Sequence, residues 1–173
     1  MSKKRSKHTR SATKPAVWLG VLGAVLLAVF AGAVWLSPSE EAMADADIVV
    51  YKTPSCGCCT LWVDHLRDNG FSVAVKNVQS TRPTQMKYGV PSALGSCHTA
   101  VVGDYWVEGH VPADLIRKLM TEQPSDIAGI SVPGMPMGSP GMEGPNPQTY
   151  DVVALQSDGE TRVYATREGR EKP

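Results

Sequence analysis

The sequence predicts an α/β fold in which a cysteine-rich turn joins a buried strand to a helix. Three observations support this prediction. The β-branched apolar run 48–52 is broken by Thr53-Pro54-Ser55, an amphipathic stretch follows the cysteines, and an alternating apolar run comes next. Together these segments predict a β-α-β unit. The segments after it predict a β-hairpin and one more helix.

The first predicted helix spans residues 60–69. Trp62 and Leu66 lie on one face, while charged side chains occupy the other. Gly70 suits the left-handed conformation that often ends a helix, so the helix is expected to stop there. The run 71–75 alternates between apolar and small polar residues and predicts the second strand.

The rest of this core contains a short helix, a connector with Val90-Pro91, a β-hairpin around Gly103-Asp104 and a last helix. The helices and strands are expected at residues 81–88, 97–102, 105–108 and 112–122. The order β-α-β, connector, hairpin and helix is typical of a thioredoxin-like core. That domain is predicted over residues 48–123.

A Gly/Pro/Met-rich loop is predicted over residues 124–148. So many helix and strand breakers gather between 127 and 148 that we expect no regular element there. Alternation returns at 150–156 and 161–166, which predicts a C-terminal β-hairpin. This hairpin and a charged tail make up residues 149–173.

The N-terminus resembles a membrane-targeting segment. Residues 1–15 hold six lysines and arginines and no acid, and residues 16–36 follow with 21 uncharged residues. A helix of that length covers about 30 Å, which is enough to cross the hydrocarbon core of a bilayer. An uncleaved anchor and a cleaved signal peptide are both open interpretations. Either places the domain in the periplasm or outside the cytoplasm, and an anchor would hold it in the inner membrane through the tether 37–47.

The charge distribution argues against nucleic acid as a partner. The whole chain has 17 basic and 17 acidic residues, and six of the basic ones lie in residues 1–15. The remainder therefore has 17 − 6 = 11 basic against 17 acidic residues, a net charge of −6. Binding to phosphates requires a basic surface on the folded domain.

The four cysteines are the strongest functional signal. Cys56 and Cys59 form a Cys-x-x-Cys motif at a helix start, where backbone amides favour the thiolate for redox exchange or metal binding. Cys58 adds a third sulfur that a dithiol oxidoreductase does not need. Three sulfurs within one turn favour Cu(I) or zinc. Structural zinc sites usually draw four ligands from two separated pairs. Here Cys97 and His98 would have to supply the second pair, which is an uncommon arrangement, so copper is the stronger expectation.

Cys97 and His98 are the expected completion of this cluster. In a thioredoxin-like core, the residue before the connector proline, here Val90 before Pro91, faces the cysteine turn and often precedes a cis peptide bond. The strand that follows starts close by. The alternatives are a disulfide between Cys97 and one of the other three cysteines, or a buried free thiol.

Five other residues are candidates for contacts behind the ligands or for a lid over the site. Methionine thioethers suit Cu(I), although packing of the loop is the ordinary alternative. For His65, the ordinary alternative is a partly buried histidine that bonds a backbone carbonyl. The five are His65, His110, Met135, Met137 and Met142.

Several segments together resemble the CopG-like periplasmic proteins, a family with a domain of formally unknown function that occurs with copper-resistance systems. The resemblance covers about residues 47–145. It implies a thioredoxin-like fold, copper binding by the cysteine cluster and a redox activity. Cys56, Cys58, Cys59, Cys97 and His98 match the family motif. The segments are Tyr51–Cys59, Trp62–Leu66, Gly89–Pro91, Ser96–Val102, Glu108–Ala113, Val132–Pro136 and Gly138–Glu143.

The first functional hypothesis is an exported Cu(I)-binding protein of metal homeostasis or resistance, with other periplasmic copper-handling proteins as partners. The second is a thiol-disulfide oxidoreductase, an enzyme with Cys56 and Cys59 as its catalytic pair. The third is an interaction domain stapled by disulfides. The first hypothesis requires Cys97 to lie beside the Cys56–Cys59 turn.

Overall fold

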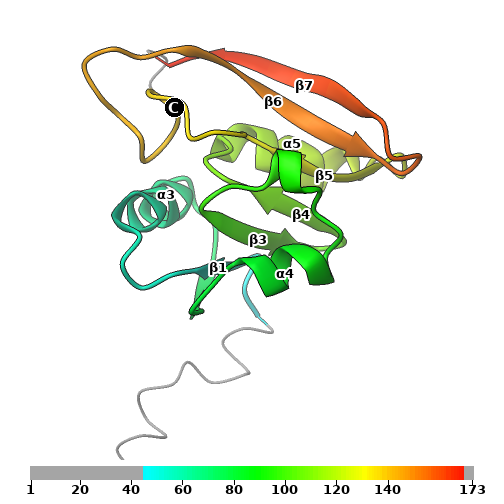
Figure 1. The fold of residues 1–173 in the computed structure, drawn as a ribbon, viewed down its shortest axis with the longest axis horizontal. Helices are drawn as coiled ribbons and strands as arrows, with labels where there is room; N and C mark the ends of the chain where they lie inside the picture. Colours follow the sequence, from blue (N-terminus) through cyan, green and yellow to red (C-terminus); the bar gives the residue numbers. More distant parts are fainter. Residues whose placement is uncertain (1–44, 170–173) are drawn as a thin grey trace, which may run out of the picture. The chain divides into compact units, whose positions relative to one another are not determined.

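The computed structural model describes residues 45–169, which form a mixed α/β structure with one seven-stranded sheet (Figure 1). This confirms the predicted α/β class. The strands are β1 (Ile48–Lys52), β2 (Val73–Asn77), β3 (His98–Val102), β4 (Tyr105–Glu108), β5 (Ile127–Ser131), β6 (Thr149–Gln156) and β7 (Thr161–Glu168). The helices are α3 (Gly57–Asp68), α4 (Arg82–Lys87), α5 (Ala113–Glu122) and the 3₁₀ turn η1 (Ser92–Leu94).

The predicted basic segment 1–15, the apolar segment 16–36 and residues 37–44 of the tether lie outside the described residues. Within residues 45–169, no helix combines the length and the apolar character needed to cross a membrane.

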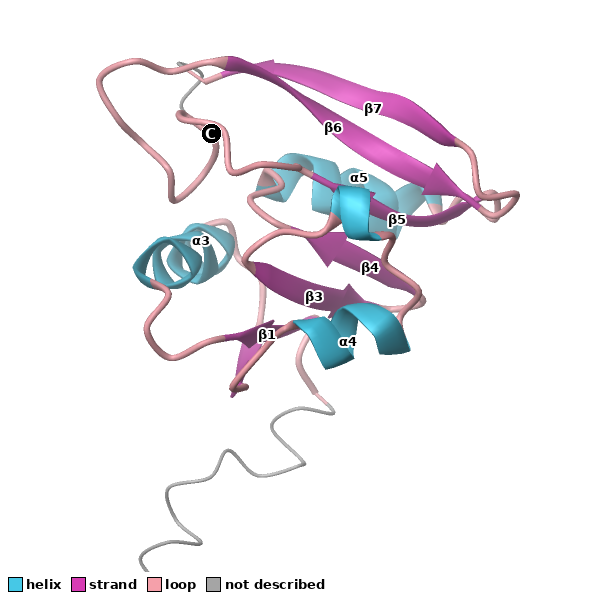
Figure 2. Ribbon diagram, viewed as in Figure 1, coloured by secondary structure: helices cyan, strands magenta, loops and turns pink. Residues whose placement is uncertain are grey.

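The strands lie in the order β2-β1-β3-β4-β5-β6-β7. The pair β1–β2 is parallel, as expected for strands joined through α3. β3 runs antiparallel to β1, and β4 runs antiparallel to β3. β5 is parallel to β4, and the long β6–β7 hairpin continues the sheet at its other edge (Figure 2).

The sheet buries side chains on both of its faces because neighbouring strand residues alternate in direction. On β4, Val107 belongs to the main core with α3 and α5, whereas Trp106 belongs to a smaller cluster with Val90 and Leu94. Trp106 packs over Gly129 of β5, where an added Cβ would meet the indole ring. A larger residue at 129 would therefore displace this tryptophan.

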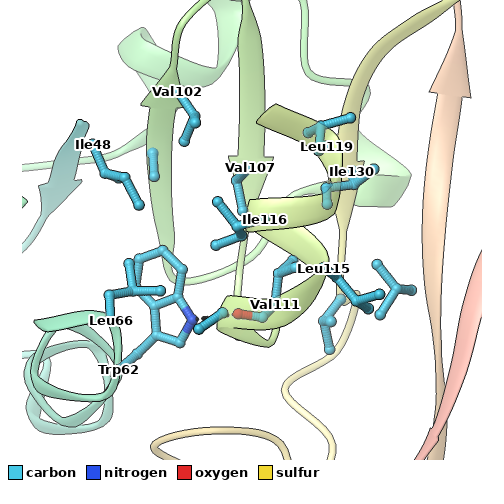
Figure 3. Packing of buried hydrophobic residues seen from close by; sticks show 14 of the residues in the cluster. Ile48, Trp62, Leu66, Val102, Val107, Val111, Leu115, Ile116, Leu119 and Ile130 are labelled. Carbon is cyan, nitrogen blue, oxygen red and sulfur yellow. Dashed lines mark hydrogen bonds between the residues drawn. The ribbon is translucent and has the colours of Figure 1, made fainter. Parts of the chain in front are cut away.

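Trp62 ties α3 to the segment before α5. Its side chain is fully buried, and its indole N–H donates a hydrogen bond of 2.9 Å to the carbonyl oxygen of Val111 (Figure 3). Leu66 on the same helix and Ile116 on α5 complete this part of the core. The bond satisfies the one polar atom of a large buried side chain and so fixes how the two helices meet.

The predicted strands and helices are present, with small shifts at their ends. α3 begins at Gly57 rather than at residue 60, so Cys58 and Cys59 lie in its first turn. The expectation of no regular element between 127 and 148 is wrong for β5. Pairing with β4 and β6 on its two sides stabilises this strand despite Gly129. The Val90–Pro91 bond is trans, and residues 45–169 contain no cis peptide bond.

Leu119→Ala tests the main core. Leu119 on α5 is fully buried, so we expect the free energy of unfolding to fall by about 2–5 kcal/mol through lost contacts and a residual cavity. Urea denaturation measures this. Leu61→Ala is the matched control because Leu61 is 56% exposed, and its effect should stay within about 0.5 kcal/mol. Equal losses in the two variants would contradict the assigned core.

Candidate metal centre

The pairing of β1 with β3 brings the two cysteine segments together. Lys52, the last residue of β1, lies opposite His98, the first residue of β3. The turn after β1 leads into the Cys56–Cys59 segment, and Cys97 directly precedes β3. The side chains of all four cysteines consequently converge. Their sulfur atoms lie within 4.8 Å of one another, although Cys97 is distant in sequence.

Two of the four sulfurs are joined in this state. Cys56 and Cys59 form a disulfide with a Cα–Cα distance of 5.4 Å. Cys58 and Cys97 are free thiols, and Cys58 Sγ lies 3.5 Å from Cys56 Sγ. Cys59 Sγ, which is fully buried, lies 3.8 Å from the carbonyl oxygen of Cys97. Since metals bind thiolates, the disulfide must be reduced before all four sulfurs can act as ligands.

Cys97 also belongs to a second group of donors, with His98 and His110. Cys97 Sγ lies 3.3 Å from His98 Nδ1 and 3.2 Å from His110 Nε2. Both imidazoles are fully buried, and their ring centroids are 5.1 Å apart. Trp62 covers the His98 ring with a centroid distance of 4.2 Å. This sulfur is therefore shared between a set of four cysteines and a mixed sulfur–nitrogen set.

The surroundings of His110 orient its ring for binding at Cys97. His110 Nδ1 lies 2.8 Å from the carbonyl oxygen of Pro140, which can only accept a hydrogen bond. The neutral ring therefore carries its proton on Nδ1 and directs the lone pair of Nε2 at Cys97. Metal-binding histidines are commonly held in this way by a carbonyl on the opposite nitrogen.

Burial keeps these groups neutral in the metal-free protein. It raises the pKa of Cys97 to about 12, with a smaller contribution from nearby Cys58. Burial, with a smaller contribution from adjacent His110, lowers the pKa of His98 to about 3. Burial also lowers the pKa of His110. Neutral imidazoles have a free lone pair for a metal, and a bound cation would offset the high pKa of the thiol.

His65 occupies a different position from the cluster. Its Nε2 atom accepts a hydrogen bond of 3.2 Å from the backbone N–H of Ala113, the first residue of α5. Burial lowers the pKa of this imidazole, and the bond requires Nε2 to be unprotonated. The hydrogen-bond partner of His65 is thus an amide donor at a helix start, whereas the ordinary alternative expected from the sequence was a backbone carbonyl.

The loop between β5 and β6 reaches the site through Pro140 and Gly141, and Figure 2 shows it descending toward α3. Gly141 has φ of +81°, and an added Cβ would lie 2.8 Å from both the Cys58 oxygen and the Trp62 nitrogen. Only glycine allows this approach. Among the predicted lid methionines, Met137 packs near Gly144, Met135 is 41% exposed and Met142 is partly buried.

His110 lies nearer to the cluster than the sequence predicted. The signal available in the sequence was Gly109, which has φ of +71° and turns the chain between Glu108 and His110. An added Cβ at Gly109 would lie 2.6 Å from the Val132 oxygen and 2.7 Å from Ser96 Oγ. The glycine lets three segments pack closely at this point and so places the imidazole beside Cys97.

Comparison with known proteins gives two kinds of match. The family described as "Protein of unknown function, DUF411" matches residues 94–142, which include Cys97, His98 and His110. Two solved structures, "Copper resistance protein copG- Form 2" and "Form 1", are each 44% identical to this chain. They cover 69% of it, and 96% and 95% of their own chains, with TM-scores of 0.66 and 0.65. A comparison with curated proteins found no match.

Thiol counting tests the assignment of the Cys56–Cys59 disulfide. In denaturant without reductant we expect two reactive thiols, and with reductant four, because Cys56 and Cys59 are bonded and the others are free. In the native protein one thiol should react slowly, because burial makes the Cys97 thiolate scarce. Cys97→Ser should remove the slow phase and Cys58→Ser the fast one. Loss of the fast phase in Cys97→Ser would contradict the assignment.

The pKa of His98 predicts how stability depends on pH. The unfolded chain protonates this imidazole near its usual pKa of 6.5, whereas the folded protein does so only near 3. The contribution of His98 to stability is therefore fully present above pH 6.5 and falls by about 1.4 kcal/mol per pH unit as the pH decreases from 6.5 toward 3. Urea unfolding of the metal-free protein at pH 7, 6, 5 and 4 measures the slope. His98→Gln should reduce the slope by that amount, and an unchanged slope would refute the prediction.

Proposed function

This chain belongs to the CopG-like copper-resistance family, and we propose that it binds Cu(I) in copper resistance or homeostasis. One observation carries the proposal, namely that four sulfurs from two distant segments lie within 4.8 Å of one another. Soft thiolates select Cu(I) over the hard divalent ions. Zinc also accepts thiolates and is the weaker candidate.

Reduction of the disulfide controls how many donors the site offers. Two electrons and two protons, delivered by a thiol reductant, convert the Cys56–Cys59 bond into two thiols. Cu(I) then displaces protons from the thiols that it binds. In the disulfide state the remaining donors are Cys58, Cys97 and the two histidines. The oxidation state of the cysteines therefore sets the affinity for Cu(I).

His98 and His110 extend the site toward nitrogen ligands. Imidazole accepts Cu(I), Cu(II) and zinc, so a mixed set with Cys97 is less selective than four thiolates. The His110 Nδ1 bond to Pro140 already orients Nε2 toward the shared sulfur. We infer that copper held near Cys97 contacts both donor sets. A donor set that accepts both Cu(I) and Cu(II) is consistent with the redox activity that the family resemblance implies.

A thiol-disulfide oxidoreductase is the second candidate function. The observation that favours it is the Cys56–Cys59 disulfide at the start of α3, directly after β1. The strand order β2-β1-β3-β4, with β1 parallel to β2, supports a thioredoxin-like interpretation of this part of the sheet. The trans Val90–Pro91 bond departs from that interpretation. Insulin reduction that persists in Cys58→Ser and disappears in Cys56→Ser would favour the enzyme.

We also propose an extracytoplasmic location, with other copper-handling proteins as partners and no nucleic acid. The uncharged run 16–36 after a basic segment supports export, and the net charge of the remaining chain is unsuited to phosphate. A reporter enzyme that is active only outside the cytoplasm, fused after Pro173, tests the location. Activity of the fusion only in the cytoplasm would contradict it.

Cu(I) titration under anaerobic conditions tests the principal function. Fully reduced protein should compete with a Cu(I) chelator at least tenfold better than the disulfide form, because it offers four thiolates. Cys97→Ser should lose at least about tenfold in affinity, since loss of a ligand should cost no less than loss of one of its supporting groups. The control replaces every cysteine with serine at positions 56, 58, 59 and 97. Equal binding by this control and the reduced protein would refute the proposal.

A further inference from the structure

Glu108 is a fully buried carboxyl group that the proposed metal chemistry does not use. It ends β4, and its Oε1 atom accepts two hydrogen bonds of 2.7 Å, one from Gln85 Nε2 and one from the backbone N–H of Ser96. Burying a carboxyl group is costly unless hydrogen bonds compensate for the water that it loses. Ser96 belongs to the segment that leads into Cys97, so these hydrogen bonds connect that segment to Glu108.

Gln85 binds the other backbone polar atom of Ser96, its carbonyl oxygen. This side chain of α4 is 6% exposed, and its Nε2 donates to the Ser96 carbonyl oxygen at 3.3 Å as well as to Glu108. Gly95 leaves room for it, because a Cβ there would lie 3.3 Å from Gln85 Nε2. The two side chains thus secure both the N–H and the C=O of Ser96.

The residue after Cys97 is held equally well. His98 begins β3 opposite Lys52, and its carbonyl oxygen accepts a bond of 3.2 Å from the backbone N–H of Gly109. Cys97 therefore lies between two anchored residues. Its sulfur can face the other cysteines and both imidazoles only while the backbone keeps this path.

We propose that Glu108 and Gln85 are positioning residues that hold Ser96 in place and thereby fix Cys97 Sγ for copper binding. The inference rests on the proposed function, in which Cys97 is a copper ligand shared by the two donor sets. Binding sites lose affinity when ligands move by even a fraction of an ångström, so rigid support is part of their energetics. Partners of this kind are worth about 10- to 100-fold in metal affinity.

The positioning role of Glu108 and Gln85 does not depend on the charge of the Glu108 carboxyl group. Burial raises the pKa of Glu108, yet Oε1 accepts hydrogen bonds whether or not Oε2 carries a proton. Glu108→Gln keeps an acceptor oxygen in the same place and should recover most of the function. Glu108→Ala removes the acceptor and releases the Ser96 N–H. The pair of variants separates an acceptor role from a simple requirement for bulk at this position.

The first measurement uses copper. Reduced Glu108→Ala should bind Cu(I) about 10- to 100-fold more weakly than unmodified protein in chelator competition, and Glu108→Gln within about threefold of it. Leu119→Ala is the stability control, because it weakens the core without touching this network and should keep its affinity. Equal affinities for Glu108→Ala and unmodified protein, or equal losses for the Ala and Gln variants, would overturn the inference.

The second measurement needs no metal. In oxidised Cys58→Ser protein Cys97 is the one free thiol. Its alkylation should become about tenfold faster when Glu108→Ala is added, because small openings of the Ser96–Cys97 segment expose the sulfur, and Glu108→Gln should leave the rate nearly unchanged. An unchanged rate in the Ala variant would contradict the inference. Failure of unmodified protein to bind Cu(I) would refute the proposed function instead, while this rate would still report on Ser96.

Gln85→Ala provides the second variant if Glu108→Ala does not fold. It removes the bond to the Ser96 carbonyl oxygen and leaves the bond from Ser96 N–H to Glu108. Both measurements should change in the same direction and by a smaller factor. No change in either would overturn the assignment of Gln85, and no change in any folded variant would overturn the whole inference.

Discussion

The antiparallel pairing of β1 with β3 is the constraint on which the site depends. It sets the end of one strand against the beginning of the other, with Lys52 opposite His98. The chain enters the cysteine turn just past the first of these residues and leaves Cys97 just before the second. A shift of register by one residue would turn the side chains of β3 to the opposite face of the sheet. The same hydrogen bonds that make the sheet therefore bring the sulfurs together.

Burial then decides the chemistry of the converged side chains. A neutral thiol and two neutral imidazoles stand within contact of one another where water is largely excluded. Charging any one of them without a partner would be costly, which is why the pKa of Cys97 rises and those of His98 and His110 fall. A metal cation can provide the missing charge. The fold thus disfavours proton gain by the histidines and leaves their lone pairs for a ligand.

Glycines allow the C-terminal part of the chain to reach the site. Gly141 brings the loop against the first turn of α3, and Gly109 lets the segment before α5 pack against Ser96 and Val132. Both have positive φ angles and backbone or side-chain atoms where a Cβ would stand. The loop can contribute the Pro140 carbonyl to His110 because of these approaches. Residues far from the cysteine turn in sequence consequently determine how the imidazole is presented.

Local pattern was sufficient for the α/β class, for the strands and helices up to residue 122 and for the C-terminal hairpin. Alternation and amphipathic spacing are properties of neighbouring residues, so they can be read without the fold. The clustering of three cysteines at a helix start belongs to the same kind of information. The family resemblance added a copper-related role that the solved structures of copper resistance proteins support.

Tertiary structure decided what depends on residues that are distant in sequence. β5 forms within a segment rich in strand breakers because β4 and β6 supply its hydrogen bonds. Which cysteines pair, how close His110 comes to Cys97, and why Glu108 is buried beside Ser96 were equally beyond local pattern. The physical reason is common to all of them: propensity acts between neighbours along the chain, whereas ligand geometry is set by contacts across the sheet.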